Sequence, residues 1–260
     1  MRKFSVLGIV LALACTSICT SIAADARSLE NVRERGVLGV CAHPNALPFS
    51  SKTGDLAGFQ MELARAIADK LGVTLQPDWV VMTFQIRAAD CDIMMDTIDD
   101  KEAQGETNLK LSRPYYRTGA ALVVAENSPI TSLAALDAHT KVGVLVGSMA
   151  AMTLGERHVG ISIFGFEDDA LEAVANHEVD AAMVTPTMAG YYNLRHPDHK
   201  LRVLALDETD PGLAWNVSVG MVRPDPALRA AIDDAVAALL ADGTVARIYA
   251  RYGVVLLPPR

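Results

Sequence analysis

The sequence predicts an α/β fold in which the strands of a parallel sheet alternate with helices. Short runs rich in valine and isoleucine alternate with segments whose apolar residues recur at helical spacing. No stretch rich in proline, glycine or serine divides the chain, and the chain contains no internal repeat or low-complexity tract. If the fold has two lobes, strands rather than a flexible linker must therefore join them.

The predicted strands are short apolar runs that follow one another along the whole chain. The first of them, GVLGVCA, predicts a buried strand because almost all of its residues are apolar. The runs cover residues 36–42, 73–79, 91–97, 115–126, 141–148, 179–185 and 215–223.

The predicted helices lie between these runs. The segment 58–72 carries apolar residues at helical spacing and ends on Gly72, a residue suited to a helix C-cap. The segment 166–178 predicts a second helix before the strand VDAAMVT. The segment 225–253 predicts a long amphipathic helix with a break at Gly243.

Residues 1–24 predict a secretory signal peptide that is removed from the mature protein. The positively charged MRK precedes an apolar run, and small residues follow for cleavage. Loss of Arg2 and Lys3 changes the formal net charge from −8 to −10. An acidic chain argues against nucleic acid as a partner. We expect a soluble, periplasmic monomer.

Two cysteines, Cys41 and Cys91, remain after removal of the signal peptide. Cysteines in an oxidising compartment often pair. Their spacing matches no zinc or CxxC motif. The sequence does not decide whether the two cysteines form a disulfide.

Several segments, taken in order, are similar to those of one known family. They are PNALPFSS, GDLAGFQMELARAIADKLGV, CDIMMDTIDD, LSRPYYRTG, KVGVLVGS, VDAAMV and LLADGTVARIYARYGV. Their succession resembles the type 2 periplasmic solute-binding proteins (extracellular solute-binding protein family 3), in the branch best known for polar amino acids. The resemblance implies two α/β lobes, crossed twice by the chain, that close on a ligand. It places lobe one at 25–124 and 216–260 and lobe two at 125–215.

Three positions depart from the pattern that the resemblance implies for amino acid binders. The aromatic platform of the first loop falls on Ala46, the arginine that holds the α-carboxylate falls on Gly105, and the aspartate that holds the α-ammonium falls on Thr185. A hydroxyl leaves most of the charge of a buried ammonium uncompensated. These departures predict that an ordinary amino acid is not the ligand.

One sub-branch of the family suggests a different ligand. The segments CAHPNALPFS, CDIMM and RPYYR resemble the accessory binding proteins associated with quinoprotein alcohol dehydrogenases. Those enzymes use pyrroloquinoline quinone (PQQ), a planar tricyclic quinone with three carboxylates. We therefore predict a binding protein that closes on a planar anionic ligand, with PQQ as the leading candidate, for uptake through a transporter or delivery to a quinoprotein dehydrogenase. PQQ is expected as a bound ligand and not as a prosthetic group.

The candidate site residues for such a ligand are aromatic, basic or hydrogen-bonding. Trp79 and Trp215 flank the predicted cleft and are suited to sandwich a flat ring, although core packing is the alternative for both. Gly147, Ser148 and Met149 lie at a strand-to-helix turn, where backbone N–H groups favour anions and where a serine cap is the alternative. The other candidates are His43, Asn45, Arg87, Thr97, Lys101, Arg113, Arg117 and Thr185.

The sequence leaves two further functions open. One is an accessory protein that binds an apo PQQ-dependent alcohol dehydrogenase, and the other is an ABC-transporter receptor for another carboxylated nutrient. No Ser/His/Asp, Cys/His or metal-ligand set has a defensible spacing, so we predict neither catalytic residues nor a metal site. The acidic run DTIDDKE is expected to be a solvated helix start.

Overall fold

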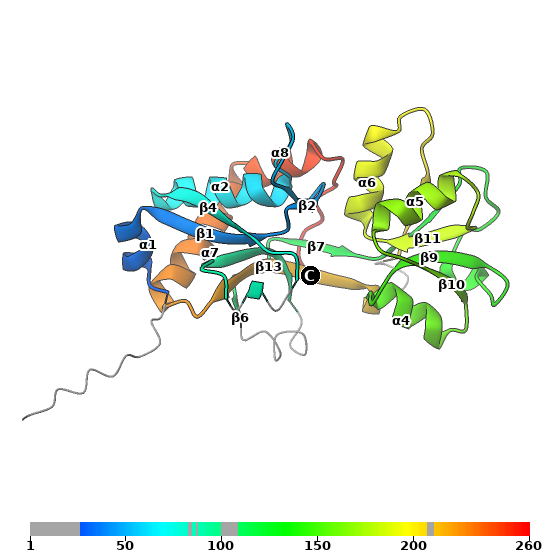
Figure 1. The fold of residues 1–260 in the computed structure, drawn as a ribbon, viewed down its shortest axis with the longest axis horizontal. Helices are drawn as coiled ribbons and strands as arrows, with labels where there is room; N and C mark the ends of the chain where they lie inside the picture. Colours follow the sequence, from blue (N-terminus) through cyan, green and yellow to red (C-terminus); the bar gives the residue numbers. More distant parts are fainter. Residues whose placement is uncertain (1–26, 83–84, 87, 100–108, 207–210) are drawn as a thin grey trace, which may run out of the picture.

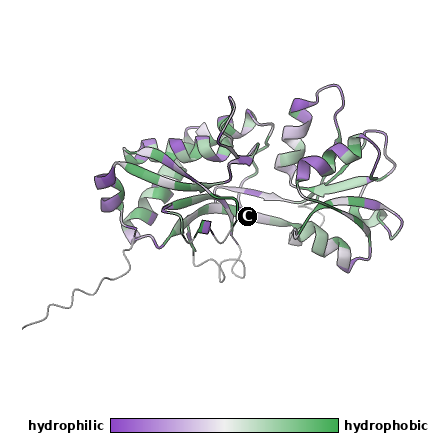
Figure 2. Cartoon of the chain, viewed as in Figure 1, coloured by the Kyte–Doolittle hydropathy of each residue, from purple (hydrophilic) through white to green (hydrophobic). Residues whose placement is uncertain are grey.

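The chain forms two α/β lobes, each built around its own sheet (Figure 1). The computed structural model describes residues 27–82, 85–86, 88–99, 109–206 and 211–260, and the predicted signal peptide lies outside them. Apolar residues concentrate on the strands, and hydrophilic residues concentrate on the outer faces of the helices (Figure 2). The predicted two-lobed α/β class is confirmed. Within the described ranges, no helix is long and apolar enough to cross a membrane.

The sheet of the first lobe has the strand order β4-β1-β5-β13-β6, and β7 also pairs with β13. Strands β1, β4 and β5 are parallel, whereas β13 runs antiparallel to β5, β6 and β7. The strands are β1 (Val37–Ala42), β4 (Thr74–Trp79), β5 (Ile93–Ile98), β6 (Leu109–Leu111), β7 (Tyr116–Gly119) and β13 (Ala214–Val222), with a hairpin of β2 (Asn45–Ala46) and β3 (Ser50–Ser51). The helices are α1 (Leu29–Arg35), α2 (Phe59–Leu71), α7 (Pro226–Ala241) and α8 (Thr244–Ala250).

The sheet of the second lobe has the order β10-β9-β11-β8-β12. Strands β9, β10 and β11 are parallel, and β8 runs antiparallel to β11 and β12. The strands are β8 (Ala121–Val124), β9 (Lys141–Leu145), β10 (Gly160–Phe164), β11 (Ala181–Val184) and β12 (Arg202–Ala205). The helices are α4 (Met149–Glu156), α5 (Glu167–Ala175) and α6 (Pro186–Arg195), with 3-10 turns η2 (Leu133–Ala135) and η3 (Pro211–Leu213).

The chain passes between the lobes at Gly119. The run 115–126, predicted as one strand, is divided there: β7 pairs in the first sheet and β8 in the second. A Cβ at Gly119 would lie 2.2 Å from the carbonyl oxygen of Leu213, so only glycine allows the outgoing and returning segments to approach this closely. Strand pairing thus places 121–124 in the second sheet, whereas the predicted boundary at 124 assigns them to lobe one.

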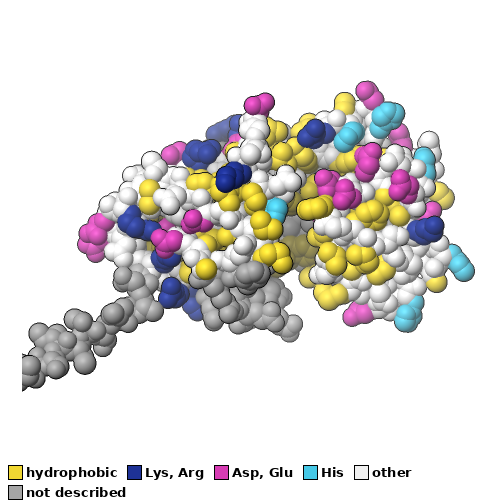
Figure 3. All heavy atoms as spheres, in the orientation of Figure 1, with side chains coloured by type: hydrophobic (Ala, Val, Ile, Leu, Met, Phe, Trp, Pro, Cys, Tyr) yellow, Lys and Arg dark blue, Asp and Glu magenta, His cyan; other side chains and the backbone are white. Residues whose placement is uncertain are grey.

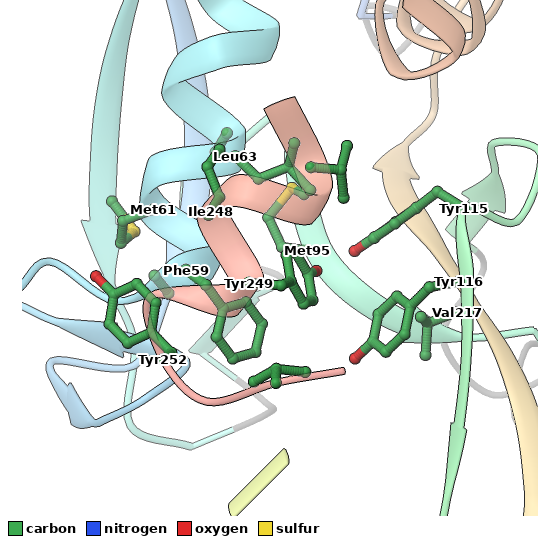
Figure 4. Close-up of a cluster of buried hydrophobic side chains, with 14 of the residues drawn as sticks. Phe59, Met61, Leu63, Met95, Tyr115, Tyr116, Val217, Ile248, Tyr249 and Tyr252 are labelled. Carbon is green, nitrogen blue, oxygen red and sulfur yellow. The ribbon is translucent and has the colours of Figure 1, made fainter. Parts of the chain in front are cut away.

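Aromatic side chains form the core of the first lobe next to the crossing. The Phe59 and Tyr249 rings lie 4.5 Å apart between centroids, and Tyr116 meets Tyr249 edge-on at 5.1 Å (Figure 4). Tyr249 belongs to α8, which follows α7 after Gly243 at a φ of +74°. The predicted break at Gly243 is therefore confirmed, and it lets the final helix turn its ring into this core.

A carboxylate, Asp96, lies against this aromatic core. It accepts hydrogen bonds from the hydroxyls of Tyr115 and Tyr249, the latter at 3.0 Å, and from Nε2 of Gln60 at 3.1 Å. Burial raises the pKa of Asp96, and these hydrogen bonds only partly oppose that shift. The network ties β5 to α2, to α8 and to the segment that enters β7.

Cys41 in β1 and Cys91 before β5 form a disulfide, with their Cα atoms 5.3 Å apart. The two cysteines are separated by 50 residues in sequence. The covalent link therefore joins β1 to the segment that leads into its neighbour β5, and it restricts the unfolded chain.

Replacement of both cysteines, Cys41→Ala with Cys91→Ala, is expected to lower the free energy of unfolding by about 2–4 kcal/mol, because the unfolded chain regains the entropy of the open loop. Urea denaturation of the oxidised wild type and of the variant measures this difference. The reductant dithiothreitol should destabilise the wild type and leave the double variant unchanged. Equal stability of the oxidised wild type and the variant would contradict the prediction.

Candidate ligand-binding site

A cavity of about 740 Å³ lies between the two lobes. It is formed where the loop after β1 faces the starts of α5 and α6, at the carboxyl-end edges of the parallel strands where open α/β sheets bind ligands. Hydrophobic side chains line both sides of this gap in Figure 3. The first lobe contributes Asn45, Ala46, Leu47 and Phe49, and the second lobe contributes Leu145, residues 166–169, Glu172, Thr185, Met188, Tyr191, Tyr192, Arg195 and His196.

The wall from the first lobe is a tight loop packed on the start of α2. The backbone N–H groups of Phe59 and Gln60 donate to the carbonyl oxygens of Pro48 and Phe49, at 2.9 and 3.0 Å, so the loop satisfies helix donors that otherwise lack partners. Gly58 has a φ of +90°, and a Cβ there would lie 2.3 Å from the carbonyl oxygen of Phe49. Glycine at this position therefore fixes how closely the loop approaches the helix.

The centre of the second wall is a carboxylate held by a threonine. Thr185 follows β11 and donates twice to Glu167: its N–H to Oε1 at 2.9 Å and its hydroxyl to Oε2 at 2.8 Å. The same hydroxyl accepts the N–H of Met188 at 3.2 Å and so caps α6. Burial raises the pKa of Glu167, opposed by the two hydrogen bonds from Thr185. Each carboxylate oxygen keeps a further lone pair for a ligand donor.

The rest of this wall is acidic. Asp168, Asp169 and Glu172 line the cavity together with Glu167, against the single arginine Arg195 and one histidine. Figure 3 shows acidic side chains gathered on the second lobe beside the gap. Like charges near a site repel and opposite charges attract, so this wall favours a cationic group and disfavours an anion.

Two tyrosines on α6 complete the wall and already have protein partners. The Tyr192 hydroxyl donates to Glu172 at 2.8 Å, and its ring stacks on His196 at 4.2 Å. Burial, with the adjacent carboxylate, raises the pKa of Tyr192 to about 12. Tyr191 is buried and lies under the guanidinium of Arg195.

Of the residues predicted for the site, Asn45 and Thr185 line this cavity. Trp79 and Trp215 do not: both are partly buried and pack against the hydrophobic core. Trp215 lies in β13 opposite Thr118 of β7, at the crossing between the lobes. The pair is therefore not placed as a sandwich around the cavity.

The predicted turn at the start of α4 is ordered by capping. The Ser148 hydroxyl accepts the N–H of Ala151 at 3.2 Å, which is the ordinary serine cap. Gly147 and Met149 are exposed, and none of the three predicted turn residues lines the cavity. His43 accepts the N–H of Asn45 on its ring Nδ1 at 3.1 Å and does not line the cavity.

The remaining predicted residues are dispersed. Thr97 lies in β5 opposite Ser218, and its hydroxyl lies 2.4 Å from where a Cβ at Gly220 would be. Arg113 is exposed, and its backbone N–H donates to Asp233 at 2.7 Å. Arg117 borders a separate cavity of about 330 Å³ beside the crossing. Arg87 and Lys101 lie outside the described residues.

The sequence did not indicate that Phe166 and Glu167 line the cavity. It placed both at the start of a helix but predicted no strand between residue 148 and that helix. The structure has β10 there, with β9 between β10 and β11, so the ends of β10 and β11 reach the same edge of the sheet. That arrangement brings Glu167 to Thr185 across 18 residues of sequence.

Comparison with known proteins supports the same architecture. Residues 38–255 match the family model described as bacterial extracellular solute-binding proteins, family 3. The histidine-binding periplasmic protein of Salmonella typhimurium is 26% identical, over 97% of this chain and 97% of its own length. The L-cystine-binding protein TcyJ of Escherichia coli K12 is 25% identical, over 94% of this chain and 93% of its own.

A solved structure agrees in fold. The ancestral cationic amino acid solute binding protein AncCDT-1 superposes with a TM-score of 0.74 at 22% identity, covering 87% of this chain and 99% of that one. The two-lobed architecture is thus shared with that structure. By the match over most of its length, the chain belongs to the bacterial extracellular solute-binding proteins, family 3.

Proposed function

We propose that this protein is the periplasmic receptor of an ABC transporter and that it binds an amino acid between its lobes. The observation that carries the proposal is the Glu167 carboxylate, fixed by two hydrogen bonds from Thr185 at the wall of the cavity. Relatives named for histidine and cystine binding support an amino acid ligand. The relative named as periplasmic, and the predicted signal peptide, support the location.

Glu167 supplies the charge that the sequence pattern lacked. Thr185 stands where the resemblance implies an aspartate for the α-ammonium of the ligand, and a hydroxyl alone compensates little of that charge. The adjacent carboxylate of Glu167 restores a negative partner within hydrogen-bond distance of Thr185. An ammonium at this point would meet two oxygens that the protein already holds in place.

The same wall argues against PQQ as the ligand. A molecule with three carboxylates would face Glu167, Asp168, Asp169 and Glu172 in one cavity. Two like charges 4 Å apart repel by about 1 kcal/mol in bulk water and by about 4 kcal/mol at an effective dielectric constant of 20. The relatives described above are named for amino acids and not for PQQ. A receptor for a nutrient is therefore favoured over both the PQQ carrier and the partner of an apo dehydrogenase.

The Glu167→Gln variant is expected to bind its amino acid about 10- to 150-fold more weakly, because a hydrogen bond to a charged group contributes about 1.5–3 kcal/mol. Isothermal titration of the mature protein with arginine, histidine, lysine, cystine and glutamate, and with PQQ, measures this change. Glu178→Gln is the matched control, because Glu178 is exposed on the same lobe and lies outside the cavity. Saturable binding of PQQ alone would contradict the proposal.

The affinity is also expected to depend on pH through Glu167. The pKa of this carboxyl in the free protein is raised above its ordinary value of 4.5, and a cationic ligand binds the ionised form. Affinity should therefore fall as the pH decreases through the raised pKa, and binding in that range should release a proton. Titrations from pH 4 to 8 in buffers of different ionisation enthalpy detect both effects. An identical pH dependence in Glu167→Gln would show that another group is responsible.

A further inference from the structure

A large apolar side chain is exposed on the wall of the cavity. Phe166 directly precedes Glu167 and has 57% of its surface exposed. More than half of the surface of this residue is therefore exposed, although burial of aromatic surface is favourable. An exposed ring beside a fixed carboxylate is suited to contact a ligand.

The position of Phe166 in its helix also indicates a role in ligand contact. It is the N-cap residue of α5 and makes no side-chain cap hydrogen bond. Serine, threonine, aspartate and asparagine cap helices best, and α4 and α6 of the same lobe begin with Ser148 and Thr185. Local helix stability therefore does not explain a phenylalanine here, and neither does packing in the core.

The first-lobe wall of the cavity leaves space for a ligand side chain that the Phe166 ring could contact. Ala46 lines the same cavity from the first lobe, at the position where the resemblance implies an aromatic platform. A methyl group leaves space there for the side chain of a ligand. The other rings of the second wall have partners, since Tyr192 stacks on His196 and Tyr191 lies under Arg195.

We infer that Phe166 stacks on the side chain of the bound amino acid from the second lobe, opposite Ala46, and selects a ligand with a flat side chain that carries positive charge, a guanidinium or an imidazole. The inference rests on the proposed function, because Glu167 holds the α-ammonium beside the ring. A ring face attracts cations, and a planar guanidinium stacks on it better than a compact ammonium does. The carboxylates of Asp168, Asp169 and Glu172 line the same cavity and add attraction for the charge.

Calorimetric titration of the mature protein with arginine, histidine, lysine and leucine tests this assignment. Phe166→Leu keeps an apolar side chain and removes the ring, and it is expected to weaken the binding of arginine or histidine about 3- to 30-fold. Lysine and leucine should lose less. Phe166→Tyr, which keeps a ring, should retain the wild-type order of affinities. Met152→Ala is the matched control, because Met152 is 60% exposed on the same lobe and does not line the cavity.

The outcomes separate this inference from the function on which it rests. If the wild type binds none of these four amino acids and neither cystine nor glutamate, the proposed function and the stacking role both fail. If it binds only amino acids without a flat, positively charged side chain, the stacking role alone fails. If the wild type binds arginine or histidine and Glu167→Gln weakens that binding, but Phe166→Leu changes it less than 2-fold or weakens all four ligands equally, only the role of Phe166 is overturned. Thermal melting of each variant confirms that it is folded before titration.

Discussion

The geometry of the binding cavity depends on the antiparallel pairing of β7 with β13. These strands carry the chain out of the first lobe and back, with Asn216 opposite Arg117 and Trp215 opposite Thr118. At their end the two segments approach so closely that Gly119 admits no side chain. A crossing made of paired strands lets the lobes move as bodies while the edges of the two sheets stay opposed, which is the arrangement that hinge closure requires.

A residue near the end of the chain, Tyr252, holds the first-lobe wall of the cavity in place. The Tyr252 hydroxyl accepts the N–H of Gly58 at 3.0 Å and donates to Glu62 at 2.6 Å. The ring of Tyr252 also meets Phe59 edge-on. The end of the chain thus secures the start of α2, and through it the loop that forms the wall. Preorganisation of this kind lowers the entropic cost of ordering a loop when a ligand binds.

The second lobe carries its negative charge on a helix start rather than on a strand end. The partial positive charge of a helix N-terminus and the two donors of Thr185 stabilise the Glu167 carboxylate, yet burial still raises its pKa. The Glu167 carboxylate has therefore lost hydration on burial, and its hydrogen bonds within the protein compensate only part of that loss. A ligand ammonium would supply the remainder, so Glu167 offers at this wall the negative partner that the Thr185 hydroxyl alone does not provide.

The sequence by itself determined the α/β class, strands such as β1 and β11, helix α2 and the break at Gly243, because each depends on local periodicity or on a single residue's backbone freedom. It did not determine which side chains meet. Trp79 and Trp215 lie near strand ends as predicted, but whether a ring faces the cleft or the core is decided by packing, and both pack against the core. Glu167 meets Thr185 only because β9 lies between β10 and β11 in the sheet. Strand order is a long-range property that no local pattern encodes. Only the tertiary structure therefore decided that the Glu167 carboxylate lies at the site and gives it a negative charge.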